Sequence, residues 1–261
     1  MSGSWEGFVK ENRSAFSSLT KEILEMLRPV REASKKISEM IPTITIEIQV
    51  PRLGGQLNIA FRNLPEQVRE ALISLAGVGW YLDPVMTPKE LWDLKTKIDE
   101  GHIESVHNIL VEHFSGRIDP IESLLSARYP DRRAIIAAAF DAHRQSQYVL
   151  SIPVFLAQAD GICSEAVLGQ DLFRRDRRKA LYSELVKQSP PDSILGAVLS
   201  PIEDNDMPIW ATNRSQDFDK LNRHLVMHGI ALEYGTESNS LKSISLINYL
   251  ASMVLPRTDQ E

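Results

Sequence analysis

Three side chains near the C-terminal end of the sequence have the chemistry needed to cleave RNA without a metal. Arg223, His224 and His228 lie within six residues of one another, and Gly229 follows them. Histidine is the side chain best suited to moving protons near pH 7. Arginine can hold a phosphate with two parallel hydrogen bonds. The cluster therefore predicts a site that activates a ribose 2′-hydroxyl and neutralises the charge that develops on phosphorus.

A helix is predicted to carry these side chains. Over residues 215–228, Phe218, Leu221 and Leu225 recur at i, i+3 and i+7 and form one apolar stripe. Gly229 is the type of residue that ends a helix.

Helical geometry limits what one copy of this helix can do. Arg223 and His228 are five residues apart, which places them roughly 140° from each other around the axis. They do not share a face, so convergence needs the long reach of Arg223 or a second chain. A symmetric homodimer, in which a two-fold axis brings two copies together, is the prediction that follows.

The order of Arg223, His224 and His228 resembles a known signature. An Arg, a polar residue and a His after four intervening residues is typical of HEPN (higher eukaryotes and prokaryotes nucleotide-binding) ribonucleases. The stretch LNRHLVMHGIALEYGTESNSLKSISLINYL and residues 78–84 also resemble uncharacterised bacterial proteins with an HEPN-like C-terminal part. The resemblance covers most of residues 78–254.

This resemblance implies an all-α bundle with the motif on a late helix and one RNA-cleaving site at a dimer interface. It implies a metal-independent endoribonuclease of phage defence or of a toxin-like stress response, with RNA as substrate and no cofactor. A protein partner or antitoxin is a further candidate partner, and the sequence does not indicate whether an antitoxin restrains the protein. His228 would act as general base or acid at the 2′-hydroxyl, Arg223 would bind the scissile phosphate, and His224 would orient or assist.

Two other interpretations of this cluster stay open. His224 and His228 are four residues apart and share a helix face, which is the spacing of a metal-ligand pair. The nearest acid downstream is Glu233, and no His-Glu-x-x-His arrangement supplies a third ligand. The second alternative is a non-catalytic helical subunit that binds nucleotides or proteins within a larger assembly.

Four further residues are candidates for substrate binding. Arg174 and Arg175 begin a basic run that attracts a phosphate backbone or simply forms a solvated helix face. Asp160 pairs with Arg223, faces solvent or caps the bend at Gly161. Tyr234 either hydrogen-bonds a phosphate or packs on the core. No role is assigned to the histidines on the polar helices, which are His102, His107, His113 and His143.

Composition indicates a globular protein. The chain has 261 residues, of which 43% are hydrophobic and 25% charged, and its net charge of −6 argues against a protein that coats nucleic acid. No apolar run is long enough to span a membrane. The single cysteine, Cys163, excludes an internal disulfide and predicts a cytoplasmic protein in which this thiol is a small buried hydrophobe.

The predicted fold is mainly α, with a C-terminal HEPN-like helical bundle and an N-terminal helix plus a small β-hairpin. We predict three regions: residues 1–85 with the helix and hairpin, connecting helices over 86–130, and the bundle over 131–261. The hairpin is expected from Thr43 to Phe61, where isoleucines alternate with polar residues. Thr87, Pro88 and Glu90 predict a helix start. Later helices are expected over 103–115, 119–128, 131–146, 148–168, 171–188, 192–199, 215–228 and 240–253, the last one capped by Ser238 or Asn239.

Overall fold

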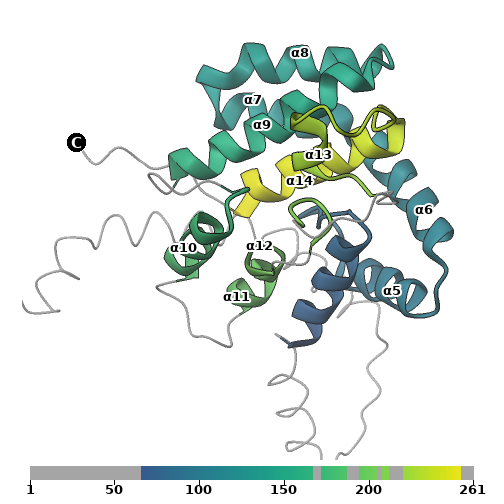
Figure 1. The fold of residues 1–261 in the computed structure, drawn as a ribbon. Coiled ribbons are helices and arrows are strands. Elements are labelled where there is room, and N and C mark those ends of the chain that lie inside the picture. Colours follow the sequence, from purple (N-terminus) through teal and green to yellow (C-terminus); the bar gives the residue numbers. More distant parts are fainter. Residues whose placement is uncertain (1–65, 167–171, 187–193, 205–206, 212–219, 254–261) are drawn as a thin grey trace, which may run out of the picture. The chain divides into compact units, whose positions relative to one another are not determined.

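Helix follows helix through the part of the chain that the structure describes (Figure 1). The computed structural model describes residues 66–166, 172–186, 194–204, 207–211 and 220–253. The chain divides into compact units of residues 1–56 and 57–261, and every described residue belongs to the second. Within these ranges the fold is mainly α, as predicted, and contains no strand. The hairpin predicted from Thr43 to Phe61 lies outside them.

Most helices fall close to the predicted ranges. An unlabelled helix covers residues 66–77. The labelled helices are α5 (Pro88–Asp99), α6 (Ile103–Ser115), α7 (Ile118–Arg128), the short 3-10 helix η1 (Pro130–Arg132), α8 (Arg133–Arg144), α9 (Tyr148–Ala166), α10 (Arg175–Val186), α11 (Ile194–Val198), α12 (Ser200–Glu203), α13 (Arg223–Met227) and α14 (Glu237–Met253). Among the described helices, none is both long and apolar enough to cross a membrane.

Local capping explains where α5 begins. The Thr87 hydroxyl accepts a hydrogen bond from the Glu90 amide, and the Glu90 carboxylate accepts one from the Thr87 amide at 2.7 Å. Pro88 occupies the first helical position, where its missing N–H costs nothing. The predicted start is confirmed.

Helix α9 lies at the centre of the fold, and it packs against α8 and α14 (Figure 1). Its sequence is apolar on nearly every side, as expected of a helix enclosed by others. Phe155 of α9 meets Phe140 of α8 edge to face, with ring centroids 4.9 Å apart. Cys163 has no exposed surface, which confirms the prediction of a buried hydrophobe.

Helix α14 is also enclosed, yet it buries several polar side chains. Ser240, Ser245 and Asn248 are all at most 2% exposed. Each has a partner on another element: His143 for Ser240, the Tyr81 amide for Ser245, and Asp83 for Asn248. A buried polar group that is hydrogen-bonded avoids the cost of desolvation, so these bonds fix how α14 sits in the bundle.

The start of α14 differs from the prediction. The helix begins at Glu237, and the Thr236 hydroxyl accepts from the Asn239 amide at 3.2 Å. Thr236 therefore caps the helix, in place of Ser238 or Asn239. Asn239 instead uses its side-chain amide to donate to the Tyr234 carbonyl at 2.9 Å. Threonine and asparagine are both good caps, and this local contact occupies the Asn239 side chain.

Candidate functional site

The predicted catalytic residues lie on α13, which is much shorter than predicted. The helix covers only Arg223–Met227, because Asn222 has an extended backbone and accepts from the Leu225 amide at 3.1 Å. The Asn222 amide also donates to the carbonyls of Pro208 at 2.7 Å and Ala211 at 3.0 Å. These three bonds hold the N-cap in place. The prediction that residues 220–222 are helical is therefore wrong, and residues 212–219 lie outside the described ranges.

The two histidines of the cluster lie against each other. The ring centroids of His224 and His228 are 4.2 Å apart, and the rings meet edge to face at 68°. His228 is exposed and follows the last residue of α13. Gly229 then adopts a φ of 67°, the left-handed conformation that ends a helix, as predicted.

Arg223 points to a different neighbour. Its guanidinium lies over the ring of Phe173, 5.0 Å from the centroid, in a cation–π contact. Phe173 comes directly before Arg174 and Arg175 in the sequence, at the start of α10. The structure thus brings Arg223 to the segment that carries both predicted phosphate-binding arginines, which are exposed.

The basic run at α10 does not act as one surface. Arg178 is only 2% exposed, and its guanidinium lies over Trp210, 4.6 Å from the ring centroid. Burial lowers the pKa of Arg178 to about 10. The interpretation of the whole run as a solvated face therefore holds for Arg174 and Arg175 but not for Arg178, which is part of the core.

Asp160 and Tyr234 are both engaged with the backbone. The Asp160 carboxylate accepts from the Leu172 amide at 2.7 Å, which ties α9 to the chain that leads into α10. The Tyr234 hydroxyl donates to the Val149 carbonyl at 2.9 Å, and its ring packs against the core. The packing of the Tyr234 ring on the core is one of the alternatives that the sequence left open, whereas the sequence did not predict the hydrogen bond between Leu172 and Asp160.

A buried carboxylate that the sequence did not single out has four hydrogen-bond partners. Asp83 has no exposed surface. One carboxylate oxygen accepts from Arg117 Nε at 3.0 Å and lies 3.0 Å from His113 Nε2. The other accepts from the Asn248 amide at 3.2 Å and from the Val85 amide at 3.3 Å. Burial raises the pKa of Asp83, but the bond to His113 and the charge and bond of Arg117 outweigh it, so the net pKa is lowered.

A second missed contact lies beside this carboxylate cluster. Trp80 Nε1 donates to His107 Nδ1 at 2.8 Å, and the indole stacks on Phe114 with centroids 5.6 Å apart. Burial, with the nearby charges of Lys242 and Lys220, lowers the pKa of His107. His107, His113 and Arg117 lie along α6 and in the turn after it, within reach of residues 78–84. Their closeness in the sequence was the signal that could have indicated this cluster.

Comparisons with protein families, with curated proteins and with solved structures found no match for this chain. Among the residues that the structure describes, no group of three histidine, cysteine or acidic side chains is placed to hold a metal ion.

Proposed function

We propose that this protein is a metal-independent endoribonuclease of the HEPN type, with Arg223, His224 and His228 as its catalytic residues. The observation that carries the proposal is the pair of adjacent imidazoles of His224 on α13 and His228 at its C-cap, 4.2 Å apart at the ring centroids, with Arg223 at the start of the same short helix. Two histidines and an arginine are sufficient for RNA transesterification.

The reaction assigns a role to each group. A neutral His228 accepts the proton of the ribose 2′-hydroxyl, and the 2′-oxygen then attacks phosphorus. The 5′-oxygen takes up a proton from water as its bond to phosphorus breaks, and His224 orients the reacting groups or assists them. Arg223 stabilises the charge on the phosphate oxygens. The products are a 2′,3′-cyclic phosphate and a 5′-hydroxyl.

Surrounding residues support RNA as the substrate. Phe173, under the guanidinium of Arg223, is half-buried, and the exposed Arg174 and Arg175 follow it. Aromatic rings between basic side chains are typical of surfaces that hold single-stranded nucleic acid. Two copies of the chain would place one Arg223 near the other copy's His228, as expected of a symmetric dimer. Phage defence or a toxin-like stress response is the biological role that the resemblance implies.

A second function is favoured by the chain after α13. Met227, Ile230 and Leu232 are exposed, and Leu232 is 83% exposed. Apolar side chains in one exposed segment are typical of a surface that contacts another protein. A non-catalytic subunit of a larger assembly is therefore the alternative to the nuclease.

The test is a cleavage assay with fluorescent single-stranded RNA in the presence of EDTA. We expect the wild type to cut the RNA and His228→Ala and Arg223→Lys to fail, while His224→Ala is impaired less. His102→Ala is the matched control, because His102 is an exposed histidine at the start of α6, away from α13. Wild-type cleavage retained in His228→Ala would refute the catalytic assignment. No cleavage by any variant or the wild type would favour the binding subunit. Light scattering that shows a monomer at micromolar concentration would refute the dimer.

A further inference from the structure

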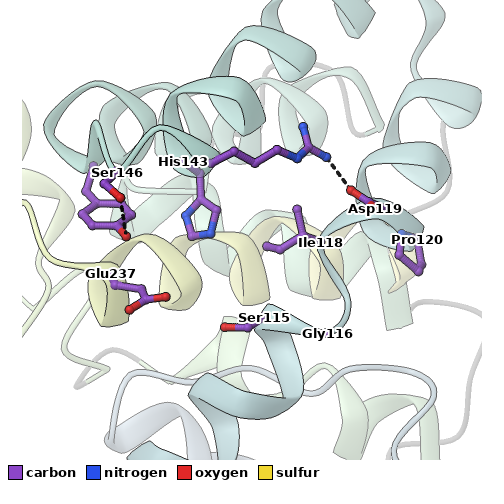
Figure 2. A pocket seen from close by; sticks show the side chains of 10 residues that line it. Ser115, Gly116, Ile118, Asp119, Pro120, His143, Ser146 and Glu237 are labelled. Carbon is purple, nitrogen blue, oxygen red and sulfur yellow. Dashed lines mark hydrogen bonds and ion pairs between the residues drawn. The ribbon is translucent and has the colours of Figure 1, made fainter.

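A polar hollow on the opposite end of α9 from α10 has a lining that the proposed nuclease does not use. It has a volume of about 420 Å³ and lies where the turn between α6 and α7, the turn between α8 and α9, and the first turn of α14 meet. Figure 2 shows the His143 ring projecting into it between Glu237 and Ile118. Its lining consists of Ser115, Gly116, Ile118, Asp119, Pro120, His143, Arg144, Ser146, Tyr148 and Glu237.

The orientation of His143 is fixed from behind by a chain of hydroxyl groups. His143 Nδ1 lies 2.8 Å from Ser240 Oγ, and Ser240 Oγ lies 2.9 Å from Ser151 Oγ. The Ser151 hydroxyl donates to the Tyr148 carbonyl at 3.3 Å. Both serines are fully buried. His143 is 8% exposed, so Nδ1 faces the interior and the edge carrying Nε2 faces the hollow.

The hydroxyl hydrogens of this chain can run in either direction, and each serine has one of them. When Ser151 donates to the Tyr148 carbonyl, Ser240 donates to Ser151, and His143 Nδ1–H donates to Ser240. In this arrangement the neutral ring has a bare acceptor, Nε2, directed at the hollow. This is the arrangement on which the inference below rests.

The ring stays neutral near pH 7. Burial lowers the pKa of His143, and the neighbouring charge of Arg144 lowers it further, against an opposing effect of Glu237. None of the described residues supplies a hydrogen bond to Nε2. An acceptor that faces the hollow can take a hydrogen bond from water or from a donor group of a bound molecule.

The charges around the hollow favour a cation. Arg144 lines it, but its guanidinium pairs with Asp119 at 2.6 Å, Glu122 at 2.5 Å and Asp141 at 3.4 Å. Its charge is thus more than compensated. The Glu237 carboxylate lies on the other side of the His143 ring, and no described residue forms an ion pair with it (Figure 2).

The rim contains the one non-glycine residue of the described chain with a positive φ. Ser146 has a φ of 58°, and it lies in the turn between α8 and α9. Its hydroxyl accepts from the Tyr148 hydroxyl at 3.3 Å, as the dashed line in Figure 2 shows. Such backbone costs about 1 kcal/mol or more and is concentrated at ligand-binding sites.

We propose that this hollow binds a small molecule with a primary ammonium group, held by His143 Nε2 and the Glu237 carboxylate. An ammonium offers three N–H donors and a positive charge, which match a neutral nitrogen acceptor and a carboxylate. One ammonium group of an aliphatic diamine would donate to the two acceptors. The other would compensate the excess of carboxylates around Arg144.

The tautomer is tested by nitrogen NMR of ¹⁵N-histidine-labelled full-length protein, with His143 assigned by comparison with His143→Gln. We expect a protonated Nδ1 and a bare Nε2, and a change in the Nε2 resonance when 1,4-diaminobutane is added. A ring protonated at Nε2 in the free protein would overturn the proposal. So would an Nε2 resonance that does not change at millimolar diamine.

The ligand class is tested by calorimetry with 1,4-diaminobutane as the probe and 1,4-butanediol as its uncharged counterpart. Glu237→Gln should weaken diamine binding by roughly tenfold or more, the loss of one charge-assisted bond. Glu100→Gln is the control, because Glu100 is an exposed acid after α5 and does not line the hollow. Equal affinity for the diol and the diamine, or equal losses in both glutamine variants, would overturn the proposal.

Discussion

Asp83 and Arg223 are both charged residues, but their burial and their contacts differ. Asp83 is fully buried and has partners from α6, from the turn after it, from its own turn and from α14. Arg223 is half-buried, and its guanidinium lies over the ring of Phe173. The hydrogen bonds of the Asp83 carboxylate therefore serve to hold helices together. The Arg223 guanidinium, by contrast, is the group that we propose binds the scissile phosphate.

The largest expected effect is on catalysis and falls on the α13 residues alone. His228→Ala should lower the rate of RNA cleavage by roughly 10²–10⁴-fold, the usual contribution of one general acid or base. Its melting temperature should stay close to that of the wild type, because His228 is exposed. Single-turnover kinetics and calorimetry on the same preparation measure both. A large fall in melting temperature would mean that His228 is structural, and the contrast with Asp83 would disappear.

The converse variant is Asp83→Ala. It leaves Arg117, His113 and Asn248 without their shared acceptor, so we expect a loss of about 3 kcal/mol in the free energy of unfolding. Urea denaturation measures the loss. Asp93→Ala is the control, since its pair with Lys89 on α5 is exposed, screened by solvent and expected to contribute little to stability. Equal losses in the two variants would show that the buried cluster does not stabilise the fold.

The free energy of unfolding in acid should depend on the Asp83 carboxylate. The folded pKa of Asp83 is lowered, so the unfolded chain binds a proton more readily than the folded chain. The stability from Asp83 is therefore fully present above the unfolded pKa of about 4 and is lost as pH falls through the lowered folded value. Denaturation at a series of pH values from 7 to 3 measures this, and Asp83→Asn should flatten the curve over the acid part. An unchanged curve in Asp83→Asn would contradict the assignment.

A smaller loss of stability is expected at Asn222, the residue that precedes α13. Asn222 is 1% exposed and caps the helix while its amide donates twice. Asn222→Ala should lower the free energy of unfolding by roughly 1–2 kcal/mol and also reduce cleavage, because the start of α13 loses its position. Asn222→Asp keeps the capping oxygen and loses the donors. If cleavage in both variants equals that of the wild type, α13 does not need this anchor.

Local signals explain why much of the helical fold was predictable. The capping box at Thr87 and the apolar period of residues 103–115 act within one or two turns, and both predictions match the structure. The start of α13 was not predictable in this way. Asn222 is held by carbonyls 11 and 14 residues away in the sequence, and these bonds override the apolar stripe that predicted a longer helix.

The same distinction applies to the candidate sites. The pairing of His224 with His228 follows from their spacing and was predictable. The partners of Asp83 lie 30, 34 and 165 residues along the chain, and Ser240 is 97 residues from His143. Only the packing of α6, α8 and α14 brings these groups together, so three histidines that looked unremarkable in the sequence turned out to have defined partners.

Because Cys163 is buried, the reaction of its thiol with a dye reports how often the protein opens. It is the sole cysteine of the chain and has no exposed surface, and burial raises the pKa of its thiol. Thiol-reactive dyes attack the thiolate at an accessible sulfur, so a dye cannot react until α9 separates from its neighbours. The rate of labelling under native conditions therefore measures how often the centre of the bundle opens. No engineered probe is needed for that measurement.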